Sequence, residues 1–194
     1  MPTINKTWAI IGGIIAIILI AVISFFSFYI GTYNDLVTLS NGIEGQWAQV
    51  ENQLQRRNDL IPNLVKVVKG YAKHEKDVFT AIADARSRLA GAKTTDDKVK
   101  ANNDMTGALS RLLMVVENYP TLQANKNFLA LQDQLEGTEN RIAVERGRFN
   151  EIVRIYNTKV QSFPASWVAR KKGFVKKPYI EVPKAKQEVP NVDL

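Results

Sequence analysis

The stretch WAIIGGIIAIILIAVISFFSFYI, residues 8–30, decides how this chain folds. It contains no charged residue, and 19 of its 23 residues are apolar. A helix of that length spans about 34 Å at about 1.5 Å per residue, enough for the roughly 30 Å hydrocarbon core of a bilayer. Trp8 and Tyr29 lie near its ends, where interfacial aromatic residues are enriched. The stretch therefore predicts a transmembrane helix.

A cleaved signal peptide is the alternative interpretation of this stretch. Its apolar region would be about 7–15 residues long and would end at a cleavage site of small residues. This run is longer, and aromatic residues crowd positions 25 to 29, so we expect an uncleaved single-pass anchor. Lys6 precedes the run and no Lys or Arg follows until Arg56. The positive-inside rule then predicts a cytoplasmic N-terminus, residues 1–7, and an extracytoplasmic domain.

Composition excludes much of enzyme chemistry. The 194 residues include no cysteine and one histidine, which excludes disulfides, thiolate metal sites, cysteine nucleophiles and multi-histidine metal sites. His74 with Glu75 and Asp77 is a weak metal-ligand set, better explained as a solvated helix junction. Three glutamates between positions 136 and 145 are better explained by surface pairing with neighbouring arginines than by catalysis. No phosphate-binding loop, G-x-S-x-G or dinucleotide motif is present, so we predict a non-enzyme without metal or cofactor.

The region from 31 to 163 has the pattern of α-helices. Apolar residues recur in steps of three and four directly after the anchor, and no turn residue intervenes. We expect the anchor helix to continue to about Tyr71, with a kink near Asn58–Pro62 because proline removes a backbone hydrogen bond. The recurring residues are Leu36, Ile43, Trp47, Val50, Leu54, Ile61, Leu64, Val68 and Tyr71.

Two short helices and one long helix complete the pattern. The short ones cover about 75–89 and about 97–116, the second capped by Asp96 or Asp97. The long one covers about 121–162 and places an apolar residue at every seventh position from Phe128 to Phe163. The predicted fold is all-α: a transmembrane helix (8–30) continuous with a long antiparallel up-down-up-down bundle of two long and two short helices (31–163), then an irregular tail (164–194).

The membrane-proximal part of this bundle predicts self-association. The short helices cover only the distal part of the long pair, which leaves a bare two-helix hairpin near the membrane. Such a hairpin cannot bury aromatic residues on both flanks, and exposed apolar patches mark interfaces. We therefore expect a lateral homo-oligomer; the alternative is that the tail covers these surfaces. The interface candidates are Leu36, Ile43, Trp47, Val50, Phe149, Ile152, Tyr156, Val160 and Phe163.

Arg57 occupies a core position of the first long helix. With antiparallel long helices it should lie near Glu136 and Glu139, where a half-buried salt bridge is the simpler interpretation. The alternative is a polar kink, with Asp59 and Pro62, that fixes helix register or receives a partner.

The excess positive charge of the chain, +7 in total, gathers in the tail. Residues 164–194 carry seven Lys or Arg against three acids, and the antiparallel path returns them toward the membrane. Aromatic and basic residues together suit an anionic lipid surface; the alternative is that the tail packs on its own or a neighbouring subunit's helices. Nucleic-acid binding is disfavoured because the helix faces are charge-balanced. The membrane-surface candidates are Trp167, Arg170, Lys171, Lys172, Phe174, Lys176 and Lys177.

Several sequence blocks resemble the LemA family. They are RRNDLIPNLVKVVKGYAKHE (56–75), ENYPTLQANKNF (117–128), LEGTENRI (135–142) and FNEIVRIYNTKVQSFP (149–164), followed by Gly173-Phe174 and the KPY at 177–179. The resemblance implies a single-pass protein of the bacterial inner membrane, with a cytoplasmic N-terminus and a periplasmic helical domain. It supplies no activity and no catalytic residues, and its implied theme is membrane partners and envelope quality control.

Two function classes follow from these features. The first is a membrane-anchored scaffold that self-associates and recruits envelope protein partners. The second is an extracytoplasmic module that binds a peptide or lipid in a groove between the long helices.

Overall fold

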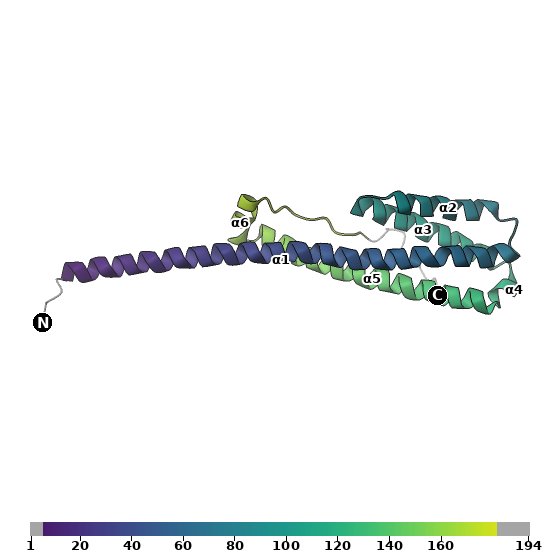
Figure 1. The fold of residues 1–194 in the computed structure, drawn as a ribbon, viewed down its shortest axis with the longest axis horizontal. Coiled ribbons are helices and arrows are strands. Elements are labelled where there is room, and N and C mark those ends of the chain that lie inside the picture. The colour runs from purple at the N-terminus through teal and green to yellow at the C-terminus, as the bar shows by residue number, and fades with distance from the viewer. Residues whose placement is uncertain (1–5, 182–194) are drawn as a thin grey trace, which may run out of the picture. The chain divides into compact units, whose positions relative to one another are not determined.

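The computed structural model describes residues 6–181, with side chains from Trp8, and over this range the chain is all-α (Figure 1). The described residues form six helices: α1 (Lys6–Tyr71), α2 (Lys76–Gly91), α3 (Thr95–Val116), α4 (Pro120–Gln123), α5 (Lys126–Gln161) and α6 (Ala165–Lys172). Residues 1–5 of the expected cytoplasmic segment and residues 182–194 of the expected tail lie outside the described range.

The chain divides into two compact units. Helices α1 and α5 each contribute one segment to both of them. The N-terminal unit comprises the chain up to Glu44 together with Ile152–Pro178. The bundle unit comprises Gly45–Glu151 together with the chain from Tyr179.

Helix α1 runs without interruption from Lys6 through the apolar stretch to Tyr71, as the absence of turn residues predicted. It contains one candidate membrane span by length and composition, and the side chains of that apolar stretch are not buried in the protein. The helix also continues through Pro62. The bend expected there stays a prediction.

The bundle unit has a core shared by α1, α2, α3, α4 and the start of α5. Thr94 caps α3: its hydroxyl accepts the backbone N–H of Asp97 at 3.1 Å and donates to the Asp97 carboxylate at 2.6 Å. Thr94 therefore takes the capping position expected of an aspartate, because its hydroxyl can pair reciprocally with Asp97. The buried core comprises Ile61, Leu64, Val68, Ala72, Ile82, Ala85, Met105, Ala108, Leu112, Val116, Leu122 and Phe128.

The last long helix begins later than its apolar spacing suggested. One turn of helix, α4, follows Tyr119, and α5 then starts at Lys126. The Asn125 carboxamide oxygen accepts the backbone N–H groups of Asn127 and Phe128, at 2.9 and 3.1 Å. An asparagine in this role satisfies the first free N–H groups of a helix, which explains the new start.

The N-terminal unit contains the apolar part of α1, the end of α5, and α6. The tail is not irregular throughout, because Ala165–Lys172 form α6. Val168 and Ala169 are fully buried on one side of this helix, and Gly173 ends it with a φ of 76°, a left-handed conformation that glycine adopts readily. Eight residues are too few for the apolar pattern of a helix to be recognised in the sequence.

Candidate functional site

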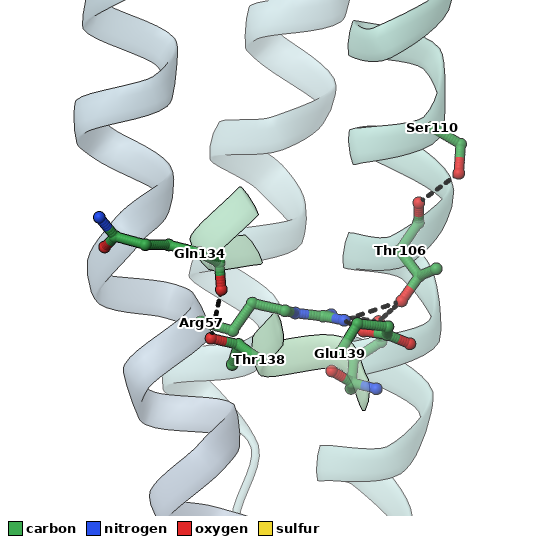
Figure 2. Close-up of polar contacts among 7 residues, drawn as sticks. Arg57, Thr106, Ser110, Gln134, Thr138 and Glu139 are labelled. Carbon is green, nitrogen blue, oxygen red and sulfur yellow. Dashed lines mark hydrogen bonds and ion pairs between the residues drawn. The ribbon is translucent and has the colours of Figure 1, made fainter. Parts of the chain in front are cut away.

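Among the described residues of the bundle unit, the most buried charge is that of Arg57 on α1, whose side chain is 3% exposed. Its guanidinium donates to the Glu139 carboxylate on α5 at 2.5 Å and to the Thr106 hydroxyl on α3 at 3.1 Å. The other terminal nitrogen donates to the backbone carbonyl of Asn102 at 3.0 Å. Figure 2 shows the guanidinium reaching from α1 between these two helices. The pairing near Glu139 that the antiparallel register predicted is confirmed.

Local hydrogen bonds along α3 and α5 orient the groups around Arg57. The Thr106 hydroxyl donates to the Asn102 carbonyl at 3.1 Å, and the Ser110 hydroxyl donates to the Thr106 carbonyl at 2.9 Å (Figure 2). On α5 the Thr138 hydroxyl donates to the Gln134 carbonyl at 2.7 Å. These hydroxyls donate to carbonyls of their own helices. The Arg57 guanidinium is therefore the principal donor that links α1, α3 and α5.

The electrostatics of this cluster depend on one carboxylate. Burial lowers the pKa of Arg57, and the negative charge of Glu139 opposes that shift. Burial also lowers the pKa of Arg146, with Glu139 raising it and Arg57 lowering it. Arginine keeps its proton in proteins, so both groups stay charged and Glu139 is the counter-charge close to Arg57. Such an arrangement links the three helices.

Asn102 is a member of this cluster that sequence reasoning missed. It is 1% exposed, and its side-chain nitrogen and oxygen both lack a hydrogen-bond partner among the described residues. The signal was its spacing, because Asn102 lies three residues after Val99 and seven before Leu109, on the apolar face of α3.

An apolar pocket of about 150 Å³ opens beside the Arg57–Glu139 pair. Four leucines contribute to its wall: Leu64 of α1, Leu109 and Leu113 of α3 and Leu135 of α5. The other lining residues, the Arg57–Glu139 pair among them, are polar or charged. This volume is about that of a cavity that holds a benzene-sized group. The pocket is therefore large enough for one apolar side chain or a short segment of acyl chain.

The other two residues of the expected polar kink lie outside this cluster. Asp59 is exposed and accepts a hydrogen bond from the Gln55 side chain at 2.8 Å, one turn earlier on α1. Pro62 is half-buried beside Ile61 and Phe79 in a shallow depression of the bundle unit. A role of these residues in receiving a partner stays a prediction.

Most of the nine interface candidates lie inside the chain. Five of them are buried within this chain. Trp47, Ile152 and Val160 are half-buried, and Phe163 is 88% exposed. The rings of Trp47 and Phe149 meet edge to face with centroids 5.8 Å apart. The part of the nine candidates in an interface between copies of this chain stays a prediction. The five buried residues are Leu36, Ile43, Val50, Phe149 and Tyr156.

The segment after α6 explains part of this burial, as the alternative considered from the sequence proposed. In the N-terminal unit the Tyr156 hydroxyl donates to the Val175 carbonyl at 3.0 Å. The Asn157 carboxamide donates to the Lys177 carbonyl at 2.9 Å and accepts its N–H at 2.8 Å. In the bundle unit Asn150 makes the same pair of bonds to Ile180, both at 2.9 Å. Sequence reasoning missed both asparagines; their signal was their seven-residue spacing on α5.

The aromatic members of the membrane-surface set pack on α1 where the apolar stretch ends. The Trp167 ring lies 5.8 Å from the Phe25 ring and 6.0 Å from the Tyr29 ring, centroid to centroid. The Phe174 ring lies 6.0 Å from that of Tyr33. The structure therefore brings α6 to the end of the candidate span within the N-terminal unit.

The basic members of this set differ in how firmly they are held. The Lys172 ammonium lies over the rings of Tyr29 and Tyr33, 5.9 and 5.3 Å from their centroids. Arg170, Lys171 and Lys176 are exposed, and Lys177 is half-buried with its backbone bound by Asn157. Arg170 also donates to the Ser166 carbonyl at 3.4 Å.

The carboxylates considered for catalysis take part in ordinary structural pairs. Glu145 accepts from the Gln46 side chain at 2.6 Å and from Arg148 at 2.9 Å. Glu136 accepts from Gln132, one turn earlier on α5, at 3.0 Å. Over residues 6–181 no group of three metal-ligating side chains comes together.

These features define a class: a membrane-associated, all-α protein whose polar clusters join helices to one another. The chain belongs to the LemA family, whose sequence profile matches residues 46–194. It is 25% identical over 197 residues to Magnetosome protein MamQ 2 of Paramagnetospirillum magneticum, covering 87% of this chain and 71% of that protein. Magnetosome protein MamQ of Magnetospirillum gryphiswaldense is 26% identical over 191 residues, covering 85% and 70%. Protein LemA of Metamycoplasma hominis is 26% identical over 151 residues, covering 76% and 68%.

Proposed function

We propose that this chain is a non-enzymatic, membrane-anchored helical scaffold that self-associates and recruits envelope partners, in membrane or envelope quality control. It would cross the bacterial inner membrane once, with its N-terminus in the cytoplasm and its helical domain in the periplasm. One observation carries the proposal: the charge-free stretch 8–30 and the core segment of the bundle unit belong to the same unbroken helix, α1. An anchor without a flexible linker suits a protein that holds a binding surface at a membrane.

Self-association is supported by one strongly exposed aromatic residue. Phe163 is 88% exposed two residues after α5 ends, and Ile155 on α5 is 42% exposed. Single exposed apolar residues are common on monomers, but an almost fully exposed phenylalanine leaves a large apolar area in water. A second copy or an envelope partner would cover it.

The mass of the full chain in detergent tests this proposal. We expect assemblies of several copies, and we expect Phe163→Ser to shift them toward single copies. Leu129→Ser is the matched control, because Leu129 is an exposed apolar residue of α5, at 45%, in the bundle unit. A full chain that stays monomeric at all concentrations would contradict the scaffold. A photo-crosslinking residue at position 163 then identifies which chains contact this surface in cells.

The pocket beside Arg57 favours the second candidate, a module that binds an apolar group of a peptide or lipid. Its four leucines and its position among α1, α3 and α5 suit such a ligand. Addition of benzene or xenon should shift the methyl resonances of Leu64, Leu109 and Leu135 if the pocket opens to small apolar ligands. Unchanged methyl resonances would contradict this candidate.

A further inference from the structure

Helix α6 lies beside the end of the apolar stretch, where a membrane-spanning helix would leave the hydrocarbon. Trp167 contacts the rings of Phe25 and Tyr29 and remains 42% exposed. Phe25 and Phe26 are 50% and 58% exposed and belong to the charge-free run. A tryptophan that packs on aromatic rings and stays partly exposed suits the boundary between acyl chains and headgroups. Trp167 therefore marks the depth of that boundary.

The cations of α6 follow Trp167 within the next helical turn. Arg170, Lys171 and Lys172 are consecutive and exposed. The Lys172 ammonium is fixed over Tyr29 and Tyr33, and Tyr33 lies four residues, or about 6 Å of helix rise, beyond Tyr29. The aromatic contacts thus hold this cation at the level of headgroups when the charge-free run occupies the hydrocarbon.

None of these three cations has a protein counter-charge among the residues that the structure describes. Within the described part of the chain no carboxylate forms an ion pair with any of them. Asp35, the first acid after the apolar stretch, is bound to Lys159 of α5 instead. The partial negative charge at the C-terminus of α6 stabilises one adjacent cation. Three consecutive cations still repel one another in the absence of an anion.

We propose that Arg170, Lys171 and Lys172, positioned by Trp167, bind the phosphate headgroups of anionic phospholipids in the leaflet that faces the helical domain. The proposal rests on the membrane anchor of the proposed function and adds a lipid class to it. Each cation near an anionic surface raises the local affinity by about fivefold. We therefore expect anionic lipid to be enriched around Trp167 by at least about twofold over its mole fraction in the membrane.

The test uses the full chain with Trp8→Phe and Trp47→Phe, so that Trp167 is the sole tryptophan. It is reconstituted into vesicles of phosphatidylcholine and phosphatidylglycerol, with bromine on the acyl chains of one lipid at a time. At equal mole fractions of the brominated species, we expect brominated phosphatidylglycerol to quench Trp167 more strongly. The triple variant Arg170→Gln, Lys171→Gln, Lys172→Gln should equalise the two lipids.

The matched control removes three exposed cations of the bundle unit: Arg86→Gln, Lys93→Gln, Lys100→Gln. It should retain the preference for phosphatidylglycerol, because it changes the net charge equally but leaves α6 intact. Equal quenching by both lipids in the parent chain would overturn the proposal, as would the absence of quenching by either. Loss of the preference in sodium phosphate, but not in sodium chloride of equal ionic strength, would overturn it in favour of a soluble phosphate.

A separate measurement distinguishes failure of the anchor from failure of the lipid site. Alkaline carbonate should leave the full chain in the vesicle pellet. A chain released by carbonate would contradict the proposed membrane anchor itself. A chain retained in the pellet without lipid preference would contradict only the headgroup site.

Discussion

Asn157 binds the backbone of Lys177 with both atoms of its carboxamide. The side-chain nitrogen donates to the Lys177 carbonyl at 2.9 Å and the side-chain oxygen accepts the Lys177 N–H at 2.8 Å. Asn157 is 2% exposed, so water cannot easily replace these bonds. The tail is thus attached to α5 through main-chain atoms, independently of the side chain that Lys177 carries.

Asn157→Leu should release this part of the tail. Two hydrogen bonds are lost and two backbone groups need water, which we expect to lower the free energy of unfolding by about 2 kcal/mol. Amide hydrogen exchange of residues 173–178 should accelerate in the detergent-solubilised chain. Asn140→Leu is the control, because Asn140 is exposed on the same helix. Unchanged exchange in Asn157→Leu would show that the tail is held by other contacts.

Breaking the Arg57–Glu139 pair from one side should destabilise the bundle unit. Glu139→Gln leaves the buried guanidinium without its close carboxylate, and we expect a loss of about 2–3 kcal/mol in denaturant unfolding. The partial exposure of Glu139, 32%, places the effect at the low end of that for buried pairs. Replacing both residues with leucine should recover most of the loss. Lys98→Gln, which removes the more exposed pair with Glu51, is the control and should cost under about 1 kcal/mol.

Arg57→Leu tests whether this arginine specifies helix register. Leucine removes the buried charge and fills part of its volume, so stability should change little or rise. If Arg57 fixes register, the variant should gain alternative packing, visible as broadened methyl resonances and altered assembly size in detergent. Higher stability with unchanged spectra and assembly would contradict the register role.

Much of this arrangement could be predicted because helical periodicity is a local property. The steps of three and four from Leu36 to Val68 identified the buried face of α1, and the antiparallel register correctly paired Arg57 with Glu139. The burial of Tyr156 could not be predicted in the same way. It depends on a tail segment whose contacts run through backbone atoms, and backbone atoms leave no pattern in the sequence.

Alkaline pH should weaken the N-terminal unit through Tyr156. Burial raises the pKa of the Tyr156 phenol above its ordinary value of about 10. The unfolded chain then loses this proton first, so the contribution to stability is complete below about pH 10 and is lost as the pH rises through the folded-state pKa. Tyr156→Phe should flatten this alkaline decline and cost about 1 kcal/mol at neutral pH, because the bond to the Val175 carbonyl is lost.

Unfolding followed from pH 7 to pH 11 checks this expectation. Tyr119→Phe provides the comparison, because burial and the Glu75 carboxylate raise the pKa of Tyr119 in the bundle unit. An alkaline decline that is as steep in Tyr156→Phe as in the parent chain would assign the loss to other groups.

Two glycines of α1 should respond differently to alanine. A Cβ at Gly45 meets no atom within 4 Å, so Gly45→Ala should stabilise the helix by about 0.5–1 kcal/mol. A Cβ at Gly42 would lie 2.5 Å from the Ile152 Cδ1 atom on α5, so this side chain must move. Gly42→Ala should therefore stabilise less than Gly45→Ala, and adding Ile152→Val, which removes Cδ1, should remove this difference. Equal gains at both glycines in denaturant unfolding would argue that Ile152 does not pack against α1 at this position.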